Sequence, residues 1–287
     1  MLSFTYWGGS QLSLLNVISL ISFARFNPNS KLIIYTISNF KGVNQWLTEE
    51  QKIQISHFFD LRILSGEPNI EILEVNHRLP QYKNINSHIH MADFIRIEKL
   101  HDHGGLWIDT DILFLSSIQN LNLENDRDMA CMTYFNVCTT GLIYSKPSTL
   151  KMKILLNNAI SLVQDNKFRK SYQALGPSLW TNLIINNRIN FHDINFLDAY
   201  KIYPYMYPEL GINPNLYDFY YGDDDFYIDN KIQGIHWYNG NELSKYFIEY
   251  HLTDSLRANT SFTPFSKVIN HLKTHIALGS FLDSLDI

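Results

Sequence analysis

Short apolar runs alternate with helix-like segments through the first 115 residues of the chain. The runs have the length and the β-branched and aromatic content of buried strands. They occupy residues 2–7, 31–38, 70–75 and 105–109. Between them we expect helices at residues 11–26, 44–58 and 91–101. This order of strands and helices predicts a mixed, mostly parallel α/β sheet flanked by helices.

Two of these expected helices have identifiable core positions. In the first, Leu14, Ile18 and Ile21 recur at helical spacing, so they should face the sheet. In the second, the core anchors should be Trp46, Ile53 and Phe58.

The second half of the chain has a different pattern. "DMACMTYF" and "TTGLIYSK" are typical of strands, and helices are expected at 150–164 and 177–187. Residues 190–237 are aromatic and loop-rich, which is typical of a segment that lines a substrate. A last helix should begin after Thr263, which is placed to cap it, with Pro264 at its first position. We therefore expect one α/β domain whose C-terminal half forms a wall for the substrate.

Composition and charge narrow the function. The 287 residues are 45% hydrophobic and carry a net charge of −5, so a nonspecific nucleic-acid binder is disfavoured. Two cysteines, Cys131 and Cys138, cannot build a disulfide framework or a zinc cluster, which favours the cytoplasm. The start lacks a signal peptide, and no apolar run is long enough for a membrane span. We expect a soluble protein with at most a peripheral membrane contact.

Paired aspartates are the main chemical signal. Asp-x-Asp pairs occur at 109/111, 126/128 and 223/225, so the spacing alone identifies no site. Only Asp109 and Asp111 follow a buried strand, at the edge where open α/β sheets bind ligands. Oxygen ligands on a short loop suit Mn²⁺ or Mg²⁺, which would neutralise a diphosphate leaving group. For the pair at 126/128 we expect a solvated turn and not a metal site.

The stretch "ADFIRIEKLHDHGGLWIDTD" resembles the sugar-binding segment of GT-A-fold glycosyltransferases with a DXD motif. That group includes yeast-type mannosyltransferases, α-1,4-galactosyltransferases, capsular polysaccharide enzymes and the glucosyltransferase domains of clostridial toxins. "FTYWGG", "GPSLWTNLI" and "GIHWYNG" are similar to further segments of the same enzymes. The resemblance implies a GT-A (Rossmann-like) fold with residues 1–115 as the nucleotide-sugar half. Residues 116–262 would then form the acceptor side, and residues 263–287 the C-terminal helix.

The resemblance also implies roles for individual residues. Asp93 and Arg96 lie three apart on one helix face and would contact the donor sugar and its phosphate; a weak surface ion pair is the alternative. Together with Asp109 and Asp111 they form the expected catalytic set. The expected metal ligands are Asp109, Asp111 and His236, although a buried structural histidine is the alternative for the last. The remaining expected nucleotide-sugar contacts are Tyr6, Trp7, Gly9, Thr110 and Trp237.

Tyr6 and Trp7 compete for one role, stacking on the nucleotide base. Adjacent strand residues point to opposite faces, so only one can do it, and the larger ring of Trp7 is favoured. Trp237 has two readings as well, because it could cover the site or simply pack.

The function implied is metal-dependent transfer of a hexose from a nucleotide sugar, UDP-linked by preference, with retention of configuration. The acceptor would be a glycan or a lipid-linked or protein hydroxyl. An inverting enzyme would need a general base, for which Asp223, Asp224 or Asp225 is the candidate. A nucleotidyl- or phosphoryl-transferring enzyme is a second alternative, although no GxxxxGK[ST] loop occurs. A binding protein without turnover is a third, but it would not need to keep both metal aspartates.

Overall fold

The computed structural model describes residues 1–37, 53, 55–123, 127–134, 137–186, 188–190, 193–206, 211, 214–223, 231–257 and 262–287. Within them a seven-stranded sheet has the strand order β10-β8-β9-β6-β1-β3-β5. Its strands are β1 (Leu2–Trp7), β3 (Lys31–Thr36), β5 (Ile70–Glu74), β6 (Gly105–Ile108), β8 (Met129–Tyr134), β9 (Val137–Ser145) and β10 (Ile194–Asp198). β1 pairs in parallel with β3 and β6, β3 with β5, and β8 with β10, whereas β9 is antiparallel to both of its neighbours. The prediction of a mixed, mostly parallel sheet is confirmed.

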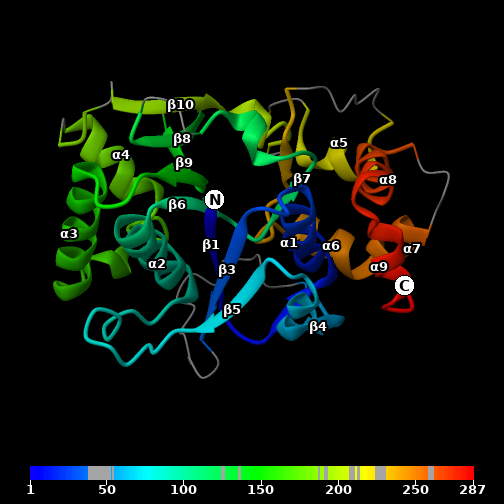
Figure 1. Cartoon of the computed structure of the whole chain (residues 1–287), viewed down its shortest axis with the longest axis horizontal. Helices are drawn as coiled ribbons and strands as arrows, with labels where there is room; N and C mark the ends of the chain where they lie inside the picture. Colours follow the sequence, from blue (N-terminus) through cyan, green and yellow to red (C-terminus); the bar gives the residue numbers. More distant parts are fainter. Residues whose placement is uncertain are drawn as a thin grey trace.

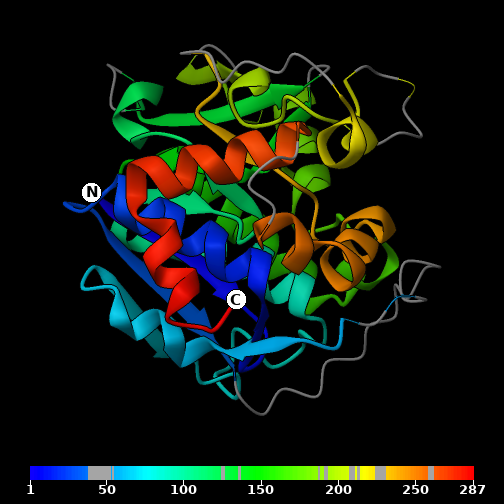
Figure 2. The same cartoon turned by 90° about the vertical axis from the view of Figure 1, so that its right-hand side faces the viewer.

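Helices cover both faces of this sheet (Figure 1). On one face lie α2 (His88–His103), α3 (Leu150–Gln164) and α4 (Pro177–Ile185). On the other lie α1 (Leu14–Phe26), α8 (Pro264–Ile276) and α9 (Leu278–Asp283), which Figure 2 shows in front of the sheet. The shorter helices α5 (Leu216–Tyr221), α6 (Glu242–Tyr250) and α7 (Leu252–Arg257) lie beyond the α1 face.

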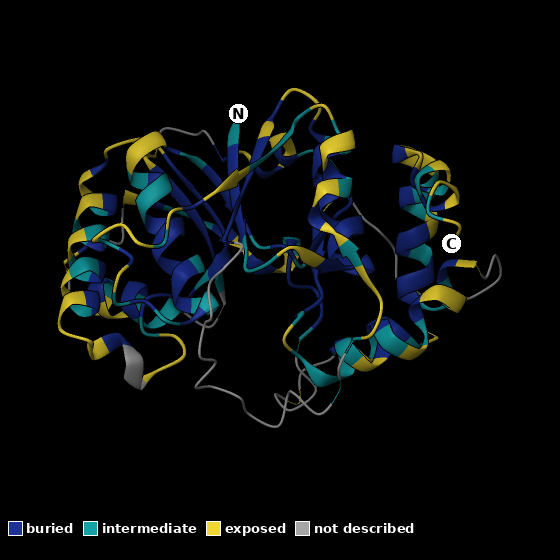
Figure 3. Cartoon of the chain, turned by 90° about the horizontal axis from the view of Figure 1, so that it is seen from below, coloured by how far each residue is buried: buried dark blue, intermediate teal, exposed yellow. Residues whose placement is uncertain are grey.

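The central strands are apolar on both sides because each side meets a layer of helices. Along β3, Leu32 and Ile34 belong to the core cluster on the α1 face, and Ile33 and Tyr35 to the cluster on the α2 face. This alternation follows from the two-residue repeat of a strand. Figure 3 shows that the central strands and parts of the helices on either side of them are buried. The strands that carry the site are therefore rigidly held.

Two small antiparallel ribbons complete the fold. The first pairs β2 (Gln11–Ser13) with β4 (Phe58–Asp60), and the second pairs β7 (Ile112–Phe114) with β11 (Gly234–His236). The second ribbon brings Gly234–His236 against Ile112–Phe114, the segment that follows β6.

Two details of the prediction are wrong. The first helix begins at Leu14 and not at Gln11, because Ser13 caps it by accepting a hydrogen bond from the Asn16 amide. Phe58 lies in β4 and is 44% exposed, so it is not a core anchor. Most of the helix expected at 44–58, including Trp46, lies outside the described residues.

Later elements agree closely with the sequence pattern. α3 spans the expected residues, α4 ends two residues early, and Thr263 caps α8 by accepting from the Ser266 amide. Among the described residues, none of the helices is long and apolar enough to cross a membrane.

Candidate active site

The Asp109–Asp111 turn lies at the carboxyl end of β6, between that strand and β7. The main chain of this turn is held from two directions. The Asp109 amide donates to the Gly141 carbonyl of β9 at 2.7 Å, and the Asp111 carbonyl accepts from the Trp237 amide at 3.0 Å. Both aspartates are thus fixed to neighbouring strands before any ligand binds.

His236 reaches this turn through the β7–β11 ribbon. It pairs with Ile112, the residue directly after Asp111, so its ring lies beside the turn. Ligand atoms of Asp109, Asp111 and His236 all lie within 4.8 Å of one another, and His236 Nε2 is 3.2 Å from Asp111 Oδ1. The three residues expected to bind a metal are therefore brought together.

Asp111 is the most tightly held of the three. Its Oδ2 accepts from the Asn239 amide at 2.8 Å, and its Oδ1 faces the His236 ring. Burial disfavours the charged carboxylate, but His236 and these hydrogen bonds outweigh it and lower the pKa of Asp111. Burial likewise opposes a charged imidazole, yet Asp111 and Asp109 raise the pKa of His236. Each group of the pair therefore favours the charged form of the other.

The chemistry of these donors fits a divalent cation. Two carboxylates and an imidazole lone pair repel one another unless a proton or a cation lies among them. His236 Nδ1 is also buried without a hydrogen-bond partner in the described part of the chain. Oxygen and imidazole ligands together suit Mn²⁺, and Mg²⁺ to a lesser degree. A bound ion would take the place of the imidazolium proton.

A buried ion-pair chain runs from α2 to the turn. Arg96 Nη1 donates to Asp93 Oδ1, and Arg96 Nη2 lies 3.0 Å from Asp109 Oδ1. The same Asp109 oxygen accepts from the Trp107 indole at 2.7 Å, and the guanidinium lies 4.9 Å from the Trp107 ring centroid. Asp93 and Arg96 are 5% and 4% exposed, so the alternative of a weak surface ion pair does not apply.

Burial shifts the pKa of Asp93. Loss of solvent raises it, the attraction of Arg96 lowers it and the Asp109 carboxylate raises it again, and together they bring it to about 6. Burial also works against the charged guanidinium, but the two carboxylates raise the pKa of Arg96, so it stays protonated. Arg96 therefore supplies a fixed positive charge beside the turn.

Two tyrosines contact the His236 ring, and the sequence did not single out the first of them, Tyr203. The Tyr203 ring stacks on the imidazole with centroids 4.8 Å apart, and the Tyr238 ring meets it edge-on at 4.4 Å. Tyr238 has a φ of 54°, a left-handed conformation that costs a non-glycine residue energy. Burial, and next Asp109, raise the pKa of Tyr203, so this phenol is neutral. No local pattern marks Tyr203, because it lies in an irregular aromatic segment.

The expected base-stacking residues occupy different surroundings at the end of β1. Tyr6 is buried and its hydroxyl lies 2.8 Å from His88 Nδ1. Trp7 is half-buried and its indole donates to the Gln11 carbonyl at 2.7 Å. Gly9 has a φ of 116°, and its carbonyl accepts from the Thr36 hydroxyl.

The other expected contacts differ in accessibility. Thr110 is 9% exposed within the turn. The Trp237 side chain is fully buried and its indole donates to the Ser19 hydroxyl at 2.9 Å, which agrees with the packing alternative. Asp223 is exposed, and Asp224 and Asp225 lie outside the described residues. Asp128 is exposed, as expected for a solvated turn.

Residues 22–128 match the family model described as "glycosyltransferase sugar-binding region containing DXD motif". The matched segment includes Asp93, Arg96 and the Asp109–Asp111 turn. No curated protein matches the chain.

Several solved glycosyltransferase structures are similar at low sequence identity. The glycosyltransferase GlyE of Streptococcus pneumoniae TIGR4 is 12% identical with a TM-score of 0.50, over 99% of this chain and 64% of GlyE. The PaToxG glycosyltransferase is 15% identical with a TM-score of 0.47, over 65% of this chain and 68% of that one. The galactosyltransferase LgtC is 13% identical with a TM-score of 0.41, over 83% of this chain and 87% of that one. This chain thus spans less than two thirds of the length of GlyE.

The fold is similar to that of GT-A glycosyltransferases, and residues 22–128 carry the sugar-binding region of a glycosyltransferase family. The expectation drawn from the "ADFIRIEKLHDHGGLWIDTD" stretch is confirmed at this level. The family match favours a glycosyltransferase over the phosphoryl-transfer alternative. It does not reach the roles of single residues, which stay predictions.

Proposed function

We propose that this protein transfers a hexose from a nucleotide sugar, UDP-linked by preference, to a glycan or another hydroxyl acceptor. One observation carries the proposal: ligand atoms of Asp109, Asp111 and His236 lie within 4.8 Å of one another at the end of β6. The two aspartates belong to the matched sugar-binding segment, and His236 lies beside it. Retention of anomeric configuration and a cytoplasmic location are part of the same proposal. They rest on the sequence resemblance and on the sparse cysteines.

Mn²⁺ or Mg²⁺ held by Asp109, Asp111 and His236 would supply positive charge for the diphosphate leaving group. The protein's own residues prepare the rest of the site. Arg96 offers a second, permanent positive charge through a planar fork that suits sugar and phosphate oxygens. Asp93 orients that guanidinium and lies on the same helix face, where its carboxyl group can accept from donor sugar hydroxyls.

Trp7 is proposed as the stacking partner of the nucleotide base. It is half-buried at the end of β1, whereas Tyr6 is enclosed and bonded to His88. Gly9 and Thr110 are proposed as main-chain neighbours of the nucleotide. For Trp237 the buried indole favours support of Asp111 through its amide over contact with the nucleotide.

A thermal-shift screen tests this function. UDP-glucose, UDP-galactose, other nucleotide sugars and free UDP are each added with and without Mn²⁺. A ligand that binds only the folded state raises the unfolding temperature by mass action. We expect a rise that needs both Mn²⁺ and a nucleotide sugar, followed by slow release of UDP and free sugar. NMR of the released or transferred sugar then gives the anomeric outcome.

An Asp111→Asn variant is the control in this screen, because it keeps the shape of the side chain but removes its charge. No shift with any nucleotide sugar in the presence of Mn²⁺, for a wild-type protein that is folded, would contradict the proposed function.

A further inference from the structure

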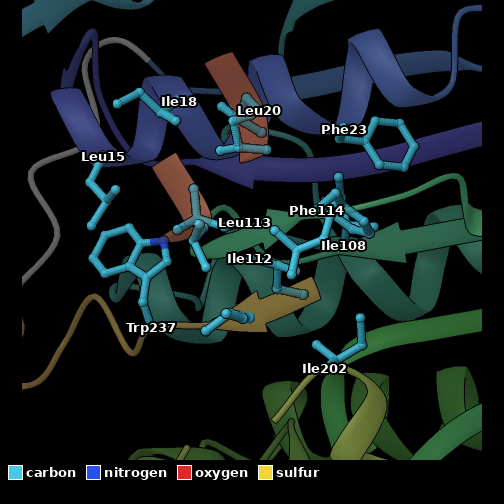
Figure 4. Packing of buried hydrophobic residues seen from close by; sticks show 14 of the residues in the cluster. Leu15, Ile18, Leu20, Phe23, Ile108, Ile112, Leu113, Phe114, Ile202 and Trp237 are labelled. Carbon is cyan, nitrogen blue, oxygen red and sulfur yellow. The ribbon is translucent and has the colours of Figure 1, made fainter. Parts of the chain in front are cut away.

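A row of buried polar side chains follows one side of α1, a helix that is otherwise apolar. Ser13, Asn16, Ser19 and Ser22 are spaced three residues apart, and each is at most 2% exposed. Figure 4 shows apolar side chains of the same helix packed against β7 and Trp237. Burying polar groups in such a layer is costly unless each is hydrogen-bonded, so their partners indicate why they are there.

Two of these side chains hold the β7–β11 ribbon. The Phe114 amide in β7 donates to Ser22 Oγ at 2.9 Å, and Ser22 donates in turn to the Ser19 carbonyl. Ser19 Oγ accepts from the Trp237 indole, just after β11. These contacts fix α1 to both strands of the ribbon at points outside the Asp109–Asp111 turn.

Asn16 is the member of the row that contacts the turn itself. Its Nδ2 donates to the carbonyl of Thr110 at 3.2 Å, and Thr110 is the residue between the two aspartates. Its Oδ1 accepts from the Ser13 hydroxyl at 2.6 Å, which sets the orientation of the amide. Asn16 is fully buried, so its contact with Thr110 is not shared with solvent.

The turn is therefore fixed at each of its three residues. Asp109 is bonded to Gly141 in β9, Thr110 to Asn16 in α1, and Asp111 to Trp237 and Asn239 after β11. Without the middle contact, the Thr110 peptide could rotate and change the directions of the two carboxylates. A residue behind a metal ligand commonly alters affinity in this way without touching the ion.

We propose that Asn16 is a positioning residue, which holds the Thr110 peptide so that Asp109 and Asp111 face one common point. This role rests on the proposed function, because the common point that the two carboxylates face would be the metal site. It goes beyond that function because Asn16 lies outside the family-matched segment and contacts neither the aspartate side chains nor His236.

The test compares Asn16→Leu with Ser22→Ala, a matched control on the same row of the same helix. Both changes remove a buried hydrogen bond between α1 and the main chain, but only Asn16→Leu releases the turn. Mn²⁺ affinity is measured by calorimetry with UDP present. We expect Asn16→Leu to weaken Mn²⁺ binding by about tenfold, the lower end of the effect of residues that orient metal ligands. Ser22→Ala should leave Mn²⁺ affinity unchanged.

A second readout does not depend on the metal. In the metal-free protein, hydrogen exchange of the amides in residues 109–111 should be about tenfold faster in Asn16→Leu than in Ser22→Ala, because a local opening exposes them. Should Asn16→Leu fail to fold, Asn16→Ala replaces it. That variant adds neither bulk nor charge, and its side chain cannot donate to Thr110.

The outcomes separate the two proposals. Equal Mn²⁺ affinity and equal exchange in the Asn16 variant and in Ser22→Ala would overturn the role of Asn16. Wild-type protein that binds no Mn²⁺ would overturn the metal part of the proposed function, and the exchange data alone would then decide the role of Asn16. Faster exchange at residues 109–111 together with weaker Mn²⁺ binding supports both.

Discussion

Gly176, at the start of α4, offers a sharp test of how firmly the site is held, through the change Gly176→Ala. A Cβ atom at this position would lie 2.7 and 2.8 Å from the two carboxylate oxygens of Asp93. Ordinary contact begins at 3.4 Å, so one group must move by about 0.7 Å.

Asp93 has little room to yield. It is buried, it is bonded to Arg96, and Arg96 is bonded to Asp109. Overpacking of this kind costs about 1–3 kcal/mol of unfolding free energy. The displacement should also pass to the sugar-binding side, so turnover of the nucleotide sugar should fall by about tenfold for each 1.4 kcal/mol lost from transition-state binding.

Denaturant unfolding gives the free energy, and release of UDP from a UDP-sugar gives the turnover. Gly279→Ala in α9 is the matched control, because no atom lies within 4 Å of its added Cβ. That change should be neutral or should stabilise by about 0.4–1 kcal/mol. If Gly176→Ala unfolds at the wild-type denaturant concentration with wild-type turnover, the inference that Asp93 is held rigidly is wrong.

Four further changes test the site directly. Asp111→Asn should abolish Mn²⁺ binding and lower turnover by a factor of about 10² or more, as for loss of a charge-stabilising group; wild-type turnover in EDTA would contradict this. Trp7→Ala should weaken UDP binding by about 1–3 kcal/mol in calorimetry, the size of one base–aromatic stack. Tyr6→Ala should mainly disturb packing and leave UDP affinity unchanged; the reverse pattern would assign the stacking to Tyr6. Asp93→Ala should lower turnover in protein that still binds UDP, and normal turnover would restrict Asp93 to a structural role.

Much of the fold could be predicted because its signals are local. The strand at Leu2–Trp7 and the helix at Leu150–Gln164 are set by apolar content and period, and Thr263 marks the start of its helix by capping chemistry. Gln11–Ser13 was assigned to a helix because its partner strand, Phe58–Asp60, is distant in sequence. Pairing between distant segments leaves little trace in either one.

The site shows the same division. Asp109 and Asp111 stand in one short segment, so their convergence could be predicted. His236 could be named only as a candidate, because the β7–β11 pairing that places it is long-range. Tyr203 and Asn16 gave no signal at all. One tyrosine among many, and one asparagine inside an apolar helix, reveal their partners only once the chain is folded.

The β7–β11 ribbon has a consequence for the way this protein is made. A ribosome delivers β6, the Asp109–Asp111 turn and β7 long before it delivers Gly234–His236. During that interval the nascent chain holds two convergent carboxylates, without the imidazole of His236 or the Asn239 amide that later hold Asp111. The last of the described strands to emerge brings His236 to the turn, so a chain that stalls before it would contain all strands of the seven-stranded sheet but not the complete cluster of Asp109, Asp111 and His236.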